Sequence, residues 1–371
     1  MKILILGTHP HAHMPSMELY AGWLKQACET EFDTHLYKPA PIFLNRFTKA
    51  LKISKWLKYI DIYVIATLRL WLVQGRYDFI ISADHGNAPT LSLVRPDRTV
   101  AMVHDVIAIH ASLFPEKDIY SIGGTGRALQ KWIVRSLKRC RLLFANPGPL
   151  SQDLRALGVS APIVVLGCPF EPRRMSAVAS PEALSGLPSH FYLNVGSDDR
   201  RKRKKDLLRM WQAFEREDSQ TWLVLAGKTN PDTSRLVGEL GLKRVKILSF
   251  VSDSLLAELY RRCKGLLVAS LFEGFCIPVL EALAAEKPVF TPADRSFFKD
   301  VFGDAVQPLI SFDQAGADAL RSAGGSPPDA AYEAARKRLL EVYGMPNFCQ
   351  LVVRSLKSLA DARLVEKVAS Q

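Results

Sequence analysis

The chain has 371 residues, which is long enough for two domains of ordinary size, and its 48% hydrophobic and 23% charged residues exclude wholesale disorder. A formal net charge of +12 favours an anionic partner, and nucleotide sugars, anionic membranes and nucleic acids all qualify. The six cysteines are scattered without metal-binding spacing, which excludes a disulfide framework and predicts free thiols in a reducing cytosol.

A short apolar run at Lys2–Leu6 opens the chain. It predicts a buried strand and not a signal peptide, because it ends in glycine and has no small-residue cleavage site. A loop with His9, His11 and His13 follows, and then an amphipathic helix over about residues 17–28. This order is typical of a βα unit, but the loop lacks the GxGxxG pattern of a dinucleotide fold. Loop histidines without a carboxylate partner are more often solvated than bound to metal, so no metal site is predicted.

The segment Pro41–Val73 is basic and amphipathic. Lysines recur every three residues among aromatic and aliphatic residues, at Lys49, Lys52, Lys55 and Lys58. The charges exclude a transmembrane span. Two interpretations stay open: these lysines bind an anionic membrane surface, or the segment is an ordinary surface helix with solvated lysines. Nucleic acid is not predicted as a partner, because no stacking motif or recognised fold supports it.

Two further buried strands are predicted at residues 78–82 and 99–103, and the second runs into His104 and Asp105. Residues at the carboxyl ends of parallel strands line the ligand crevice of a doubly wound sheet. A His-Asp pair in that place can equally be a structural hydrogen bond. Residues 173–190 are rich in Ser, Pro and Ala, which predicts a hinge between two halves of the chain.

The second half repeats the alternation of strands and helices. A strand at 191–196 is followed by the charged run Ser197–Lys205 and a helix that begins near Asp206. Such a run is usually a solvated loop, but its position after a strand points cations into a ligand crevice. The last two helices are expected at about residues 330–343 and 346–368.

The stretch Ser270–Phe290 holds two glutamates, Glu273 and Glu281, on either side of Pro278. Pro278 predicts the start of a helix, and the residues before it offer no side-chain oxygen as a cap. The first amides of this helix are therefore expected to bind an anion such as a phosphate, with Glu281 in the first turn accepting bonds from ligand hydroxyls. Alternatively, both carboxylates only complement the helix dipole on a solvated face.

The same stretch, EGFCIPVLEALAAEKPV, resembles the signature of the retaining nucleotide-sugar glycosyltransferases of family four, usually written EGFGLPVLEAMACGKPV. Cys276 stands where that family has glycine. The resemblance extends, more weakly, over nearly the whole chain. In the first loop, Pro15 and Ser16 replace the Gly-Gly pair that is usual in the family, and the loop histidines are expected to shape an acceptor pocket.

The resemblance implies roles for individual residues. His104, Lys202 and Glu273 are expected at the reaction centre. The expected donor-binding residues are Ser197, Arg201, Lys202, Gly274, Phe275, Cys276 and Glu281, and the expected acceptor-binding residues are His13, Ser16 and Asp105. Counting back from Leu207 and Leu208 places Arg201 and Lys202 on the diphosphate-binding Arg-Lys pair of the family. Lys204 remains a second candidate for this role.

The expected fold is two Rossmann-like doubly wound α/β domains facing across a cleft, the GT-B fold. Its expected parts are an acceptor domain (1–172), a hinge (173–190), a nucleotide-sugar domain (191–345) and a helix (346–371) packing back on the first domain. The expected activity is metal-independent, retaining transfer of a sugar from a nucleotide diphosphate donor to a glycan or lipid-linked acceptor of envelope polysaccharide or lipopolysaccharide, without a cofactor. The expected location is cytoplasmic, with peripheral attachment to the inner face of the membrane.

Two alternatives stay open. One is a sugar-nucleotide epimerase or a phosphorylase of the same architecture. The other, from a different class, is a noncatalytic protein that docks on anionic membranes or nucleic acid through its two basic runs.

Overall fold

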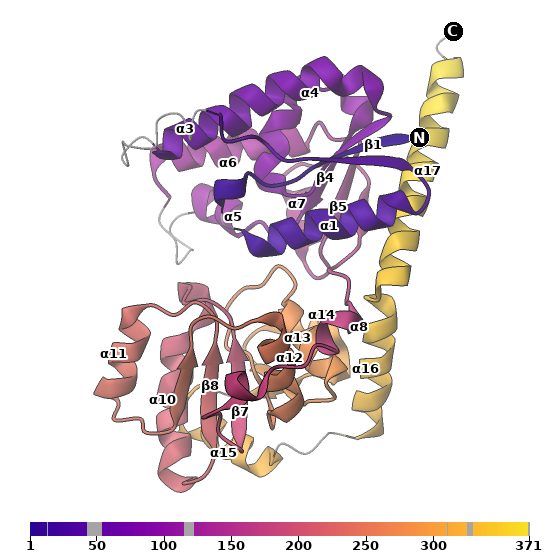
Figure 1. Ribbon diagram of the computed structural model, residues 1–371. Helices are drawn as coiled ribbons and strands as arrows, with labels where there is room; N and C mark the ends of the chain where they lie inside the picture. Colours follow the sequence, from indigo (N-terminus) through magenta and orange to yellow (C-terminus); the bar gives the residue numbers. More distant parts are fainter. Residues whose placement is uncertain (13, 43–53, 115–121, 310, 325–328, 370–371) are drawn as a thin grey trace. The chain divides into compact units, whose positions relative to one another are not determined.

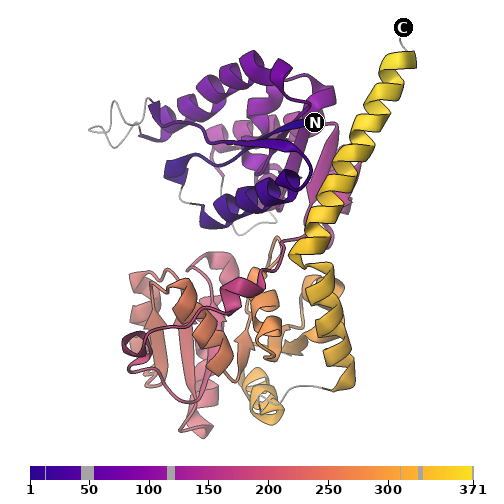
Figure 2. The same cartoon turned by 45° about the vertical axis from the view of Figure 1, so that its right-hand side comes forward.

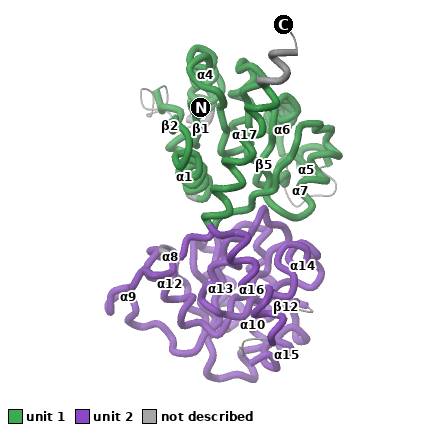
Figure 3. Tube along the Cα trace, turned by 90° about the vertical axis from the view of Figure 1, so that its right-hand side faces the viewer, with its two compact units in different colours: residues 1–169, 345–371 green, residues 170–344 purple. Residues whose placement is uncertain are grey.

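The computed structural model describes residues 1–12, 14–42, 54–114, 122–309, 311–324 and 329–369 (Figure 1). The chain forms two compact units (Figure 3). Unit 1 comprises residues 1–169 and 345–371, and unit 2 comprises residues 170–344. His13, Lys49 and Lys52 lie outside the described residues.

Unit 1 is built on a parallel six-stranded sheet in the order β2-β1-β3-β4-β5-β6. The central strands are continuous apolar runs buried on both faces, as expected when helices cover both sides of a parallel sheet. The edge strand β2 is only partly buried, which explains its mixed sequence DTHLY. The strands are β1 (Lys2–Leu6), β2 (Asp33–Tyr37), β3 (Phe79–Ser82), β4 (Thr99–Val103), β5 (Leu142–Ala145) and β6 (Ile163–Val165).

The helices of unit 1 include one unusual element, a π-helical segment, η2, between two α-helices. The elements are α1 (Pro15–Glu29), α3 (Ser54–Ile60), η2 (Asp61–Ala66), α4 (Thr67–Val73), the 3-10 segment η4 (His85–Leu93), α5 (Ile107–Leu113), α6 (Gly124–Leu137), α7 (Leu150–Ala156) and α17 (Met345–Ala369). Short 3-10 turns lie at Pro10–Ala12, Gln74–Arg76 and Pro96–Arg98. No helix of the described residues is long and apolar enough to cross a membrane.

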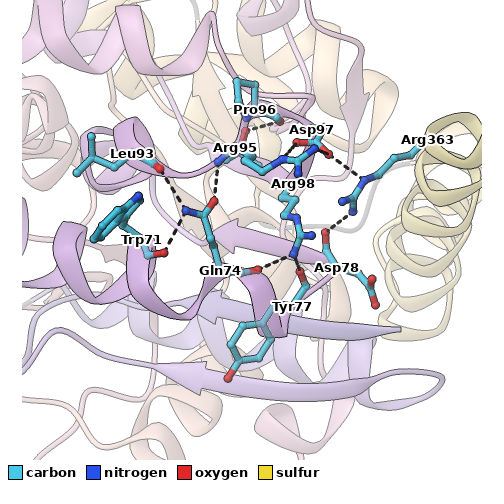
Figure 4. Close-up of polar contacts among 11 residues, drawn as sticks. Trp71, Gln74, Tyr77, Asp78, Leu93, Arg95, Pro96, Asp97, Arg98 and Arg363 are labelled. Carbon is cyan, nitrogen blue, oxygen red and sulfur yellow. Dashed lines mark hydrogen bonds and ion pairs between the residues drawn. The ribbon is translucent and has the colours of Figure 1, made fainter. Parts of the chain in front are cut away.

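The last helix, α17, belongs to unit 1, where it packs against α1 and runs along the side of the sheet (Figure 2). Arg363 fastens it there. Its Nε lies 2.9 Å from Asp97 Oδ2, and its Nη1 donates a 3.1 Å hydrogen bond to the carbonyl of Asp78, directly before β3 (Figure 4). A guanidinium shared between a carboxylate and a carbonyl fixes the position of the helix along the sheet.

Unit 2 has a second parallel six-stranded sheet, in the order β12-β11-β10-β7-β8-β9. Its core is aromatic: Trp211 and Phe214 stack at 4.5 Å and pack with Tyr192. The strands are β7 (Phe191–Val195), β8 (Trp222–Ala226), β9 (Val245–Leu248), β10 (Gly265–Leu267), β11 (Val289–Pro292) and β12 (Gln307–Leu309). The helices are α8 (Pro172–Met175), α9 (Pro181–Leu184), α10 (Lys204–Glu217), α11 (Pro231–Glu239), α12 (Asp253–Arg262), α13 (Ile277–Ala284), α14 (Ser296–Phe302), α15 (Gln314–Ala323) and α16 (Ala330–Val342).

Both sheets are doubly wound, which confirms the predicted fold class. The strand order reverses between β1 and β3 in unit 1 and between β7 and β10 in unit 2. In open α/β sheets, ligands bind outside the carboxyl ends of the strands at such a switch point. The topology therefore selects one candidate site in each unit.

Candidate functional site

The switch point of unit 2 joins the charged run after β7 to the glutamate loop after β10. Arg201 Nη1 donates a 2.7 Å hydrogen bond to Glu273 Oε2, and Lys202 Nζ bonds the other oxygen, Oε1. The two loops are also tied by their backbones, because Leu271 N donates to Arg201 O at 2.7 Å. Residues far apart in sequence thus form a single charged cluster.

The carboxylate of this cluster is buried and ionised. The Glu273 side chain is 5% exposed, and its partners Arg201 and Lys202 are 25% and 15% exposed. Burial by itself would raise the pKa of Glu273, but the positive charges of Lys202 and Arg201 outweigh burial and hold the pKa below its usual range. Arg201 Nε also lies 3.7 Å from Asp199 Oδ1, so the two cations face two carboxylates, and an incoming diphosphate would compete with these carboxylates for the cations.

Two other cations of the charged run, Arg203 and Lys204, have different partners. Lys204 Nζ lies 2.6 Å from Asp198 Oδ1 in a buried pair, and Arg203 Nε lies 2.9 Å from Asp206 Oδ2. Asp198 also accepts a hydrogen bond from Asn230 N. Ser197 is exposed and lies two residues after the end of β7. The structure therefore groups Arg201 and Lys202, and not Lys204, with Glu273.

The residue that replaces the family's glycine has a strained backbone. Cys276 has φ 74° and ψ 65°, in the left-handed region that favours glycine, and it precedes α13 without a side-chain cap hydrogen bond. Burial, together with the negative charge of Glu273, raises the pKa of the Cys276 thiol, so the thiol is neutral.

Helix α13 differs slightly from the prediction. It begins at Ile277, so Pro278 is its second residue, and Glu281 is its fifth residue and does not lie in the first turn. Glu281 is 7% exposed and accepts a 2.9 Å hydrogen bond from the hydroxyl of Tyr260 on α12. Burial and the charge of Glu281 raise the pKa of Tyr260, which keeps the phenol a donor. The alternative of two carboxylates on a solvated face is therefore wrong.

The other two residues of this loop differ in burial. Gly274 is half-buried, whereas Phe275 is 3% exposed. The ring of Phe275 packs edge-on against Tyr343 with 4.8 Å between ring centroids. Phe275 thus anchors the loop in the core, and only its backbone could contact a ligand.

The switch point of unit 1 is lined by buried polar groups. His104 follows β4 and is 5% exposed, with its ring edge-on to Tyr20 at 4.7 Å. Its Nε2 lies 2.8 Å from the carbonyl of Ala83, so Nε2 carries the proton and Nδ1 is the acceptor nitrogen of the neutral ring. Burial lowers the pKa of His104, although the charge of Asp84 opposes this effect.

The segment after β3 contributes two residues that the sequence did not single out. Asp84 Oδ1 accepts a 3.0 Å hydrogen bond from Gly86 N and lies 3.5 Å from His85 Nδ1. The rings of His85 and His104 are 6.5 Å apart. The polar ends of β3 and β4 thus converge, whereas Asp105 Oδ1 accepts from Ile107 N at the start of α5. The rule that ligands bind at strand ends could have identified Asp84 and His85 in the sequence.

The loop after β1 adds a second unexpected pair. His9 is 1% exposed, which corrects the expectation that the loop histidines are solvated, and its Nε2 lies 3.8 Å from Asp61 Oδ2 of η2. Burial lowers the pKa of His9, and Asp61 opposes that shift. His11 and Ser16 are exposed. Across the described ranges, no group of three or more metal-ligating side chains could hold a metal ion.

Part of unit 2 matches a known protein family. Residues 182–323 match the family model described as "Glycosyl transferases group 1". The chain is 32% identical over 124 residues to the serotype-specific mannosyltransferase WbdA of Escherichia coli, covering 32% of this chain and 15% of that protein. It is 24% identical over 249 residues to the O-antigen chain mannosyltransferase B of Escherichia coli, covering 63% of this chain and 62% of the relative. The chain thus spans less than two thirds of the length of these curated relatives.

Solved structures share the fold over nearly the whole chain. A sucrose-phosphate synthase from Thermosynechococcus elongatus superposes with a TM-score of 0.72 at 15% identity, covering 98% of this chain and 100% of that chain. The Anabaena protein HepE, in complex with UDP and glucose, superposes with a TM-score of 0.66 at 17% identity, covering 96% and 100%.

Proposed function

We propose that this chain, whose residues 182–323 match the glycosyl transferases group 1 family model, transfers a mannosyl residue from a nucleotide diphosphate donor to a hydroxyl of an O-antigen or related lipopolysaccharide glycan. The sugar and the acceptor class are suggested by the mannosyltransferases that it resembles. The observation that carries the proposal is the cluster of Arg201, Lys202 and Glu273 at the switch point of unit 2.

This cluster fits the leaving group of the reaction. When the bond between the anomeric carbon and the diphosphate breaks, negative charge develops on the diphosphate oxygens. Arg201 and Lys202 are held in place by Glu273 before the reaction, so they stabilise that charge with little reorganisation. Amides at the start of α13 add positive potential, and Glu281, positioned by Tyr260, would accept hydrogen bonds from the ribose.

Retention of the anomeric configuration is expected from the family resemblance and from the two ion pairs of Glu273. A carboxylate that bonds both an arginine and a lysine is a poor covalent nucleophile, which favours attack on the same face of the sugar. In that step the acceptor oxygen bonds to the anomeric carbon, and its proton passes to a diphosphate oxygen. No divalent metal is required in this scheme, because the two cations neutralise the diphosphate.

The acceptor would bind at the switch point of unit 1. His104 is neutral and buried beside Tyr20, so its ring can orient a sugar hydroxyl without adding charge. The polar groups of Asp84 and His85 lie at the same strand ends. His13, Ser16 and Asp105 remain proposed acceptor contacts.

Attachment to an anionic membrane is part of the proposal. The helical run from α3 to α4 carries exposed apolar side chains, among them Trp56, Trp71 and Leu72, next to the basic segment of the sequence. Replacing Lys49, Lys52, Lys55 and Lys58 by serine should reduce flotation with anionic vesicles and leave donor hydrolysis intact. Unchanged flotation would reject membrane attachment.

The test of function is a calorimetric screen of GDP-, UDP- and ADP-sugars, followed by turnover with a mannosylated acceptor. Saturable binding of one donor, weakened when Lys202 is replaced by alanine, supports the transferase and contradicts a noncatalytic anion-binding protein. Epimerisation of the sugar without an acceptor, or turnover that depends on phosphate, would instead identify the epimerase or phosphorylase.

A further inference from the structure

An open apolar groove of about 460 Å³ lies in unit 1 between the helical run α3–η2 and α6, which lie close together in Figure 1. This volume is within the range of small-molecule sites. Tyr59, Tyr63 and Val64 form one wall, and Ala128, Leu129 and Trp132 form the other.

The polar atoms of two aromatic groove residues, Tyr63 and Trp132, are hydrogen-bonded to other parts of the protein. The hydroxyl of Tyr63 donates a 3.0 Å hydrogen bond to the carbonyl of Gly86, and the indole nitrogen of Trp132 donates to Ser92 Oγ at 3.1 Å. The rings of Tyr63 and Trp132 are 5.5 Å apart. Because these two polar atoms are bonded outside the groove, the rings of Tyr63 and Trp132 present their carbon atoms to it, which suits a hydrocarbon.

Cations flank the groove. On α6, Arg127, Lys131 and Arg135 recur every four residues and are exposed, one position before the groove residues Ala128 and Trp132. The sequence from Gly124 to Arg141 contains six basic residues and no acidic residue. An apolar groove beside a basic stripe complements an amphiphile whose hydrocarbon chain carries an anionic head.

The groove adjoins the candidate acceptor site. Gly86, which accepts the bond from Tyr63, donates its own amide to Asp84, and His85 lies between them in sequence next to His104. The wall of the groove is therefore hydrogen-bonded to the segment that carries the polar strand ends of unit 1.

We propose that this groove binds the hydrocarbon chain of a lipid phosphate or lipid diphosphate that carries the acceptor sugar, with the phosphate against the basic stripe of α6. The inference rests on the proposed function and specifies its acceptor class. A second copy of the chain fits less well, because a symmetric contact would oppose two identical basic stripes. Binding to a bilayer surface would not require a groove, whereas binding of a single hydrocarbon chain does.

The test is isothermal titration of the full chain with farnesyl phosphate below its critical micelle concentration. Saturable binding is expected, with farnesol and inorganic phosphate each binding more weakly. Ala128→Trp should fill the groove and weaken binding by about tenfold or more, since several methylenes lose their apolar contacts. The control Ala156→Trp, at an exposed alanine of α7 outside the groove, should leave binding unchanged.

A second pair of variants tests the proposal even if Ala128→Trp does not fold. Val64→Glu places a charge in the wall of the groove, whereas Leu72→Glu places the same charge at an exposed site of α4 outside it. Only Val64→Glu should abolish binding. Equal effects of both variants, or full competition by anionic phospholipid vesicles without lipid phosphate, would overturn the groove assignment in favour of a general membrane surface.

Donor binding separates failure of this inference from failure of the proposed function. Nucleotide-sugar binding, measured in the same samples without lipid, should be unchanged in Ala128→Trp. If the wild-type protein binds and turns over its donor but does not bind farnesyl phosphate, the proposed lipid site is refuted and the proposed function is not. Farnesyl phosphate binding without any nucleotide-sugar binding refutes the transferase.

Discussion

Replacing Glu273 by glutamine tests the ion cluster of unit 2. The substitution keeps the size of the side chain but removes the charge that holds Arg201 and Lys202. At 2.7 Å and an effective dielectric constant of about 20, one such ion pair attracts with roughly 6 kcal/mol. Desolvation offsets part of this, and losing one partner of a buried pair costs about 3–5 kcal/mol. Because Arg201 and Lys202 keep 25% and 15% exposure, we expect the lower end, about 3 kcal/mol.

Thermal unfolding measures this loss. A destabilisation of about 3 kcal/mol should lower Tm by roughly 6–12 °C for a unit of this size. The control is Glu239→Gln, which breaks an exposed 3.5 Å pair with Arg235 and should change the free energy of unfolding by less than about 1 kcal/mol. Added nucleoside diphosphate should raise the Tm of Glu273→Gln more than that of the wild type, because the ligand replaces the missing negative charge.

The pH dependence gives an independent check with a definite sign. The pKa of Glu273 is lowered in the folded protein from its ordinary value of 4.5, so its stabilisation is fully present above that value. The stabilisation is lost as the pH falls through the lower folded pKa. The difference between wild type and Glu273→Gln should therefore be constant near neutral pH and shrink in acid. A variant that melts like Glu239→Gln, or a difference that grows in acid, would refute the ion cluster.

Three further substitutions test individual roles. Lys202→Ala should lower turnover by about a hundredfold, since it removes one charge-stabilising donor, and unchanged kcat would contradict that role. Glu281→Ala should weaken donor binding by about tenfold in calorimetry, through lost hydrogen bonds to the ribose, and should also destabilise the free protein by about 1–3 kcal/mol, because the buried hydroxyl of Tyr260 loses its acceptor. Cys276→Gly should stabilise the protein by about 1 kcal/mol in chemical unfolding, because glycine adopts φ 74° without strain, and a loss of stability would show that the cysteine side chain contributes more by packing.

Local apolar runs predicted most of the strands, and the resemblance to the glycosyltransferase family assigned Arg201, Lys202 and Glu273 to one site. Strands such as β1, β4 and β7 are apolar runs between turn residues, and the motif around Glu273 is contiguous. The sequence missed β2, whose half-exposed side chains do not form an apolar run, and it predicted neither β11 nor β12. It also missed the contact between His9 and Asp61, because only the folded sheet brings the loop after β1 against η2.

The π-helical segment η2 explains why the polar site and the apolar groove of unit 1 lie back to back. Buried residues repeat every four positions at Ile62, Ala66 and Leu70, which is the ordinary inward stripe of a helix. The wider turn of η2 adds Asp61 to that buried side, where it meets His9. Val64 on the opposite side stays 48% exposed and lines the groove. One short segment thus supplies a carboxylate to the polar cluster and a wall to the groove, as an amphiphilic acceptor would require.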